Sequence, residues 1–279
     1  MIRGNEHRSW LLLALVVAPT IHAQIPETLY DAAVIDYEIQ RRYKHQHRII
    51  RDFFVDIITI NKNLFSKRPI LAFAAFMPAY IGVRHADQFM HKRFYDHHTH
   101  KDIHQLPSTL CKVFGDEGVA VPIVLLSSLA VFSRDERLRQ TSNMFAKGVV
   151  AIQITKKIIK EFSKTDCNIR PLCGKFEKKQ VYGGFPSGHM AVSTFMALMY
   201  GIRHGKAWGV PLGAYAIANF GVALNCNRHF ASQLVMGAAL GATYAFASLK
   251  TLKEKYGNLS CGMSMNMWGN PTIEMTYSY

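Results

Sequence analysis

Two histidines in short polar motifs are the strongest candidates for chemistry in this chain. His189 ends the sequence PSGH, which starts at Pro186, and His229 follows Arg228 forty residues later. A Pro-Ser-Gly turn that opens a helix presents unpaired backbone N–H groups at the positive end of the helix dipole, which suits an anionic oxygen. Upstream, Arg170 offers a guanidinium group next to a proline. Together these residues indicate phosphate chemistry.

The motifs resemble those of the type 2 phosphatidic acid phosphatase and vanadium haloperoxidase superfamily, whose pattern is K-x6-RP, then PSGH, then SR-x5-H-x3-D. Pro186–His189 reproduces the middle motif, Arg170 precedes the proline that ends the first, and His229 takes the place of the histidine in the third. Residues 234–241 also resemble the apolar helix that follows the third motif. The resemblance covers residues 110–250 and implies an all-α helical bundle.

The lysine of the first motif is displaced in this chain. Counting back seven residues from Arg170 reaches Ser163 instead of a lysine. Lys160 fits the motif if the loop is three residues longer, and Lys157 and Lys164 are the alternatives. Lys160 is therefore the first of three candidates for this position.

Two further departures concern groups close to the chemistry. Ala223 stands where the family has arginine, and Gln233 stands where it has aspartate. A carboxylate at that place orients the imidazole and stabilises its cation, whereas an amide brings no charge. In a serine-protease triad, replacing the orienting aspartate by an amide lowers turnover by about 10⁴-fold. The chain is therefore expected to be a weak enzyme or an inactive relative.

The resemblance implies roles for these residues without a metal or other cofactor. His229 attacks phosphorus in line and forms a phosphohistidine, and Gln233 orients its ring. His189 protonates the leaving alkoxide and later activates water. The expected ligands of the phosphate oxygens are Lys160, Arg170, Arg228 and the N–H groups around Ser187 and Gly188.

The resulting prediction is an exported phosphatase that hydrolyses phosphomonoesters or lipid phosphates. The alternative is a catalytically impaired relative that binds phosphate or phospholipid, favoured by Gln233 and Ala223. A vanadate-dependent haloperoxidase is a weaker third hypothesis, because the missing arginine leaves the oxyanion charge less balanced.

The overall charge of the chain favours acidic partners. Its 279 residues carry a formal net charge of +14, with a sequence pI of about 9.6. Such an excess suits a phosphate-bearing small molecule, a phospholipid or an anionic membrane surface. The sequence has no zinc-finger spacing or aromatic RNA-binding motif, so nucleic acid is not an expected partner.

The first residues have the pattern of an export signal. Arg3, His7 and Arg8 precede an apolar run, and residues 1–23 are predicted to be a cleaved signal peptide, with a retained membrane anchor as the alternative. The folded part is then periplasmic or secreted, with membrane association as a further expectation. Cys167 and Cys173 flank Arg170, and a disulfide and two free thiols both fit this spacing.

The remaining chain shows helical periodicity almost throughout. The expected helices are Pro26–His47, Arg51–Ile60, Pro69–Val83, Val119–Phe132, Asn143–Phe162, Met190–Arg203, Ala207–Leu224 and Ser232–Leu252. We divide them into N-terminal helices (24–109) and a phosphatase-like core (110–255). The C-terminal tail (256–279) alternates around Asn270, which predicts a short β-hairpin or strand, with a tail without regular structure as the alternative.

The lengths of the apolar runs bear on membrane embedding. A spanning helix needs about 20 mostly apolar residues. Pro69–Val83 and Val119–Phe132 are shorter, Ala207–Leu224 is marginal, and the mean hydropathy is only +0.02. We therefore expect a bundle of buried core helices, with membrane embedding as the alternative.

Six histidines between His85 and His104 raise the hypothesis of a metal site. Four basic side chains are interspersed with them: Arg84, Lys92, Arg93 and Lys101. These would repel a cation, and the histidines lack an ordered ligand spacing. We assign no metal to the chain.

Overall fold

A computed structural model describes residues 49–93, 95–96, 101–102, 116–165, 184–226, 228–257, 260–265 and 271–276. The chain divides into two units, Met1–Ile50 and Arg51–Tyr279, and almost all described residues belong to the second. The predicted signal peptide, the Pro26–His47 helix and the loop with Arg170 and its two flanking cysteines lie outside the described residues.

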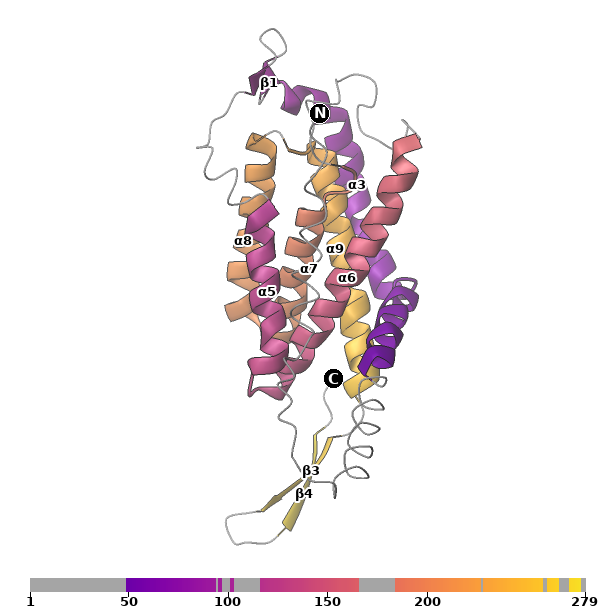
Figure 1. Cartoon of the computed structure of the whole chain (residues 1–279), viewed down its shortest axis with the longest axis vertical. Coiled ribbons are helices and arrows are strands. Elements are labelled where there is room, and N and C mark those ends of the chain that lie inside the picture. The colour runs from indigo at the N-terminus through magenta and orange to yellow at the C-terminus, as the bar shows by residue number, and fades with distance from the viewer. Residues whose placement is uncertain are drawn as a thin grey trace, which may run out of the picture. The chain divides into compact units, whose positions relative to one another are not determined.

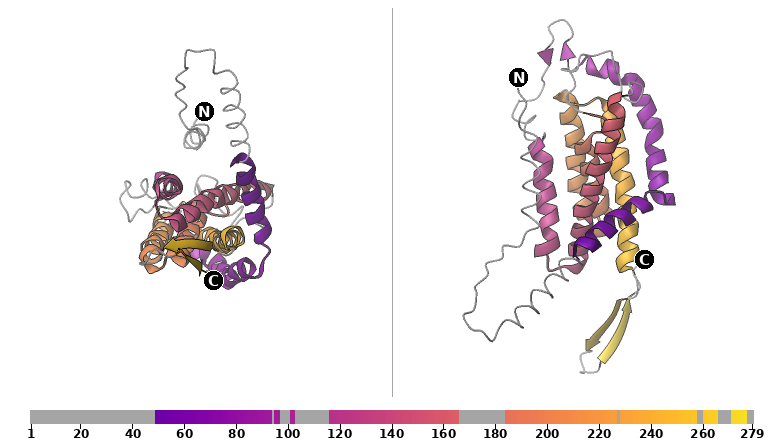
Figure 2. Two further views of the ribbon diagram at one scale, coloured as in Figure 1. Left: turned by 90° about the horizontal axis from the view of Figure 1, so that it is seen from below. Right: turned by 45° about the vertical axis from the view of Figure 1, so that its right-hand side comes forward.

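The second unit is built from long helices (Figure 1). The described helices are a helix over residues 49–63, of which residues 51–63 belong to this unit, and α3 (Lys67–His91), α5 (Asp116–Phe132), α6 (Glu136–Thr165), α7 (Gly188–His204), α8 (Lys206–Asn225) and α9 (Ala231–Tyr256). Helices α5 to α9 run alongside one another, as the views of Figure 2 show. The all-α fold is confirmed, and each expected helix within the described residues is present and longer than predicted.

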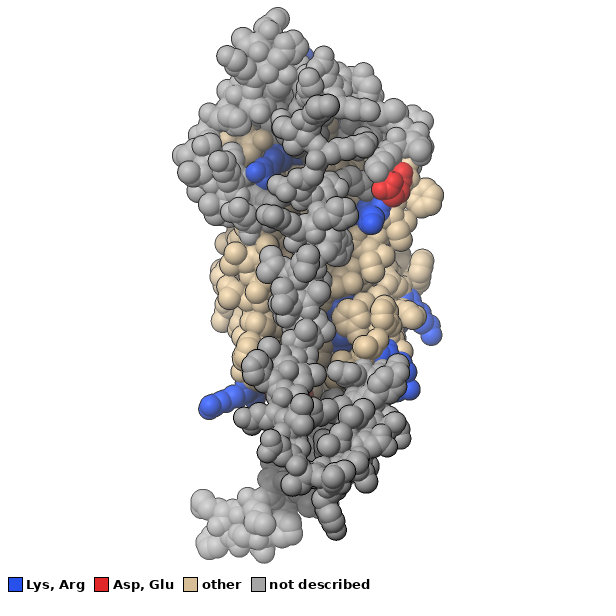
Figure 3. Space-filling model, in the orientation of Figure 1, with Lys and Arg blue, Asp and Glu red and all other residues tan. Residues whose placement is uncertain are grey.

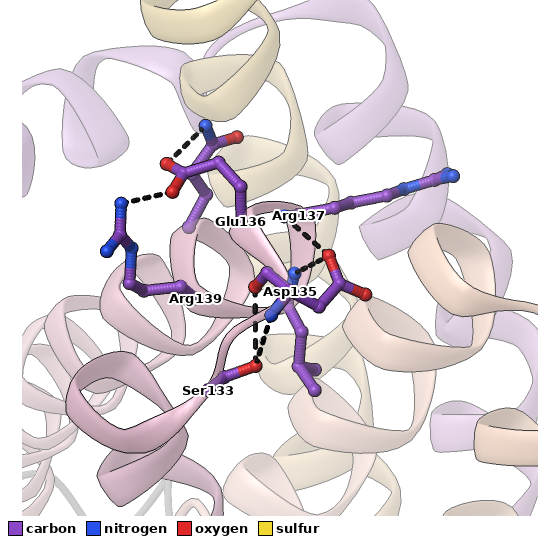
Figure 4. Close-up of polar contacts among 7 residues, drawn as sticks. Ser133, Asp135, Glu136, Arg137 and Arg139 are labelled. Atoms are coloured by element: carbon purple, nitrogen blue, oxygen red, sulfur yellow. Dashed lines mark hydrogen bonds and ion pairs between the residues drawn. The ribbon is translucent and has the colours of Figure 1, made fainter.

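The helices are longer because polar residues extend them beyond their apolar runs. The start of α6 illustrates this (Figure 4): the backbone N–H groups of Arg137 and Leu138 donate to Oδ1 of Asp135 at 2.8 and 3.3 Å. Glu136 pairs with Arg139 one turn later. An aspartate cap satisfies N–H groups that have no partner in the helix. The helix therefore begins seven residues before the predicted Asn143.

Helix α9 packs along α3, α7 and α6 and forms the centre of the unit. Its Gly241 faces the backbone of α7, where a Cβ would overlap the carbonyl oxygen of Ala191. Between α6 and α7, Phe145 stacks on Phe195 with ring centroids 5.3 Å apart. Nearby, the hydroxyls of Ser142 and Tyr200 are 2.8 Å apart. At these contacts between α6 and α7 the interior combines stacked aromatic rings with a hydrogen-bonded pair of hydroxyl groups.

A buried charged group connects residues 51–63 to the rest of the unit. Asp56 Oδ2 accepts hydrogen bonds from Nζ of Lys147 on α6 and Nζ of Lys255 on α9, both at 2.6 Å. Because Asp56 and Lys147 are buried, each charge requires the other. This contact fixes residues 51–63 against the C-terminal part of α9.

The surface of α8 differs from the expectation of buried core helices. Of its 20 residues, four are buried: Ala216, Asn219, Ala223 and Asn225. Among the described residues, α8 is the helix that is long and apolar enough to cross a membrane. The described surface visible in Figure 3 is also largely uncharged. The expectation is wrong for α8, because a helix packed mainly on α7 has only one face to bury.

Two antiparallel strand pairs complete the described structure. β1 (Tyr95–Asp96) pairs with β2 (Lys101–Asp102), and β3 (Ser260–Met265) pairs with β4 (Pro271–Thr276). In the second pair Ser260 lies opposite Thr276 and Met265 opposite Pro271. The predicted C-terminal hairpin is confirmed.

Candidate functional site

The candidate site lies at the end of the bundle where α7 and α9 begin. This end is uppermost in Figure 1, because α7 and α9 run downward from it while α6 and α8 run up to it. His189 lies in the first turn of α7, and His229 directly precedes Phe230, the N-cap residue of α9. Helix topology therefore brings the two histidine motifs to the same end of the unit.

The start of α7 is the predicted anion-binding turn. Ser187 caps the helix, with its Oγ accepting from the N–H of Met190 at 3.4 Å, and its own N–H donates to the carbonyl of Gln233 at 3.1 Å. Ser187 and Gly188 are buried, whereas His189 is partly exposed. The first N–H groups of a helix carry partial positive charge. The turn thus presents its dipole next to a titratable ring.

Lys156 of α6 lies across the start of α7. A Cβ on Gly188 would stand 2.5 Å from Nζ of Lys156 and also meet its Cδ and Cε. Only a residue without a side chain leaves room for the lysine to lie there. The glycine of the PSGH motif therefore brings an ammonium group to the helix N-terminus.

The hydrogen bonds of His229 define its tautomer. Gln233 Oε1 lies 3.1 Å from Nδ1 of His229 and accepts from the backbone N–H of Phe230 at 3.2 Å. Because an N–H group can only donate, the atom facing Phe230 is the amide oxygen. The same oxygen cannot donate to the ring, so Nδ1 of His229 carries the proton. Nε2 is left with its lone pair.

The surroundings of His229 keep the ring neutral. Loss of solvent around the ring is the main cause that lowers the pKa of His229 to about 4, and the nearby positive groups His189, Lys156 and Arg228 add to it. The bond with Gln233 acts in the opposite direction and is outweighed. The ring of His229 is therefore neutral at neutral pH, with one proton on Nδ1 and none on Nε2.

The loop before His229 closes α8 and carries Arg228. The backbone N–H of Arg228 donates to the carbonyl of Ala223 at 3.0 Å, and Cys226 is disulfide-bonded. Ala223 is buried with Met190 and Leu234 in a small apolar cluster. At this position the chain therefore contributes packing where the family pattern has a guanidinium.

A buried hydrogen-bond chain connects α8 to the first turn of α7. Nδ2 of Asn219 donates to Oγ of Ser193, whose hydroxyl donates to the carbonyl of His189, both at 2.8 Å. Asn219 and Ser193 are both buried. This chain fixes the backbone that carries His189.

The structure brings most of the predicted site residues together: His189, His229, Gln233, Ser187, Gly188 and Arg228. Lys160 lies on α6, but its side chain is outside the described residues, as is all of Arg170. The alternative Lys157 is exposed.

The sequence analysis missed Lys156. It lies four residues before Lys160, so both start from the same face of α6. Once α6 is known to be a continuous helix, this periodicity adds Lys156 to the candidates. Counting residues back from Arg170 could not identify Lys156, because the count passes through the loop between α6 and Arg170.

The described part of the chain contains no candidate metal-binding site. No three His, Cys, Asp or Glu side chains there lie close enough together to hold an ion. Most of the histidine-rich segment lies outside the described residues, so the prediction about it stays a prediction.

Comparison with known proteins gives one structural similarity. No protein-family model and no curated protein matches the sequence. The chain resembles the crystal structure of a transmembrane PAP2-type phosphatidylglycerolphosphate phosphatase from Bacillus subtilis. The two are 16% identical, with a TM-score of 0.46, over 69% of this chain and 99% of the other.

Proposed function

We propose that this chain is an exported, metal-independent phosphatase that hydrolyses phosphomonoesters or lipid phosphates through a phosphohistidine intermediate. The observation that carries the proposal is a neutral His229 whose Nδ1 is held by Gln233, which leaves the lone pair of Nε2 available. The positive groups that influence this ring, His189, Lys156 and Arg228, match what a phosphate ester requires.

The proposed reaction has two steps that these residues can perform. Lys156, Arg228 and the N–H groups at the start of α7 bind the phosphate oxygens. The Nε2 lone pair of His229 attacks phosphorus, and the ester P–O bond breaks as His189 gives its proton to the leaving oxygen. His189 then takes a proton from water, which attacks phosphorus, and the P–N bond breaks to restore Nε2. Lys160 and Arg170 remain predicted further ligands.

A second candidate function is phosphate or phospholipid binding without turnover. It is favoured by the neutral amide of Gln233, which accepts from Nδ1 of His229 but supplies no negative charge. Phosphorylation makes the ring cationic among other positive groups, and a carboxylate would stabilise that cation. The proposed enzyme is therefore expected to be slow. If the missing charge abolishes turnover completely, the chain is a phosphate-binding or phospholipid-binding protein.

The location proposed for the enzyme is outside the cytoplasm and at a membrane. The disulfide at Cys226 supports an oxidising compartment. The exposed apolar face of α8 and the net charge of +14 support contact with an anionic bilayer. A lipid phosphate is accordingly the first substrate to test.

Phosphate release tests the proposal directly. The purified protein in detergent would be assayed on a panel of phosphomonoesters and phospholipids, with and without a chelator, beside His229→Ala. Chelator-resistant release that disappears in the variant is expected. No release from either protein, with inorganic phosphate or vanadate still bound, would instead establish the binding function.

A further inference from the structure

Asp87 of α3 makes a buried contact with the first turn of α9, close to the site. Its Oδ1 accepts the backbone N–H of Ser232 at 3.0 Å, and its Oδ2 accepts the Ser232 hydroxyl. Asp87 and Ser232 are both almost fully buried. A carboxylate is favourable at a helix N-terminus, where N–H groups lack partners within the helix.

Helix α9 needs this contact because its own N-cap has no polar side chain. Phe230 occupies the N-cap position, and Gln233 bonds back to the Phe230 N–H. The side chain of Phe230 has no acceptor for the N–H of Ser232, and this N–H donates instead to Asp87, a residue 145 positions earlier in the chain.

Ser232 is directly followed by Gln233, which contacts both halves of the site. The Gln233 side chain accepts from Nδ1 of His229, and its carbonyl accepts from the N–H of Ser187 at the start of α7. The position of this one residue therefore sets the ring of His229 relative to the anion-binding turn. Asp87 holds the residue next to it.

We propose that Asp87 is a positioning residue, whose contact with Ser232 fixes the first turn of α9 so that Gln233 keeps His229 in the Nδ1–H tautomer. Nε2 is thereby kept available for reaction. The catalytic consequence rests on the proposed phosphatase function, whereas the tautomer does not. Because a misplacement of about 1 Å at a reacting group can lower a rate by about 10²-fold, loss of the contact is expected to act on turnover.

The test compares Asp87→Ala with Asp56→Ala, which also removes a buried carboxylate that accepts two hydrogen bonds, but between Lys147 and Lys255. Nitrogen NMR of histidine-labelled protein reports the His229 tautomer, and thermal unfolding reports stability. Asp87→Ala is expected to give mixed tautomers and a kcat about 10²-fold lower, with KM nearly unchanged. Asp56→Ala is expected to lower Tm without changing the His229 tautomer or kcat.

Milder variants keep the test decisive if Asp87→Ala prevents folding. Ser232→Ala removes one hydroxyl at the contact, and Ser142→Ala removes one from a buried pair with Tyr200. Ser232→Ala is expected to lower kcat several-fold and Ser142→Ala to leave it unchanged. Asp87→Asn is expected to restore the tautomer and most of the rate, since its amide can bond both groups of Ser232.

The outcomes separate this inference from the proposed function. A His229 that keeps its Nδ1–H tautomer in Asp87→Ala and Ser232→Ala would overturn the positioning role, as would unchanged kcat in an active protein. If the wild-type protein releases no phosphate, the proposed function fails, and the tautomer measurement still decides the role of Asp87.

Discussion

In the proposed reaction, the rate is expected to depend most directly on the side-chain amide of Gln233. In Gln233→Glu a carboxylate oxygen takes the place of Oε1, which lies 3.1 Å from Nδ1 of His229, and the bond from Phe230 is preserved. The added charge stabilises the imidazolium, so turnover is expected to rise by at least about tenfold, given the roughly 10⁴-fold loss for the reverse exchange in a triad.

Measured kcat for wild type, Gln233→Glu and the shorter Gln233→Asp checks this expectation. A higher kcat in either acidic variant would indicate that Gln233 limits the turnover of an otherwise complete site. A loss in both would contradict the prediction and show that the native site works with an amide.

The lowered pKa of His229 predicts an unusual pH dependence. The folded ring has a pKa of about 4, whereas an unperturbed histidine has one of about 6.5. The proposed nucleophile therefore stays neutral as pH falls through 6, and the acidic limb of kcat/KM that belongs to it is expected near pH 4. Between about pH 6.5 and 4 the unfolded ring is protonated and the folded ring is not. The free energy of unfolding is therefore expected to decrease as the pH is lowered through this window.

The imidazole NMR titration of His229 measures the same pKa without turnover. A midpoint close to 6.5 would contradict the prediction. Gln233→Glu should move this midpoint upward, because a carboxylate favours the charged ring.

Lys156 and Lys157 form a matched pair for testing the phosphate cradle. Lys156 lies against Gly188 at the start of α7, whereas its neighbour Lys157 is exposed. Lys156→Met is expected to lower kcat/KM by about 10²-fold, the size seen when one group that stabilises transition-state charge is removed. Lys157→Met should leave kcat/KM unchanged. Equal losses in the two variants would show that α6 contributes only general positive charge.

Among the helices, the pairing of α7 with α9 decides the geometry of the site. Gly241 permits this close approach, since a Cβ there would overlap the carbonyl oxygen of Ala191, whereas nothing lies within 4 Å of a Cβ on Gly213 of α8. Gly241→Ala is expected to destabilise the protein by about 1–3 kcal/mol through overpacking. Gly213→Ala should be neutral or stabilise by up to about 1 kcal/mol, because alanine favours a helix.

Thermal and denaturant unfolding in one detergent measure both glycine variants. A Gly241→Ala protein as stable as the wild type would mean that α7 and α9 do not approach as closely as described. The site should respond as well, because Gly237, one turn before Gly241, would place its Cβ against the carbonyl oxygen of Ser187.

For the molecule as a whole, the apolar exposed surface predicts a lipid environment. Ile217 on α8 is 75% exposed, and Phe65 in the turn before α3 is 83% exposed. A lysine in the middle of a lipid-facing helix costs about 2.5–3.5 kcal/mol, whereas near a helix end it reaches the interface. Ile217→Lys is therefore expected to reduce recovery from the membrane fraction, and Phe65→Lys is expected to have little effect. An Ile217→Lys protein that is better recovered without detergent would contradict this.

Much of the fold and part of the site could be predicted from local sequence. The helices are recognisable from their apolar periodicity, and the hairpin at Ser260–Thr276 from alternation near Asn270. His189 and His229 are marked by motifs a few residues long. The helix ends were underestimated, because caps such as Asp135 extend helices with polar residues that carry no apolar signal.

The sequence by itself determined the candidate residues for the proposed chemistry: two histidines, a helix-opening PSGH turn and a glutamine in place of a carboxylate. Tertiary packing decided which groups join them. Lys156 reaches the turn because Gly188 leaves space on a neighbouring helix, and Asp87 caps α9 from 145 residues away. The low pKa of His229 also arises from packing, through loss of solvent around the ring and through the positive groups of Lys156 on α6 and His189 on α7. These depend on distances between segments, which no local pattern encodes.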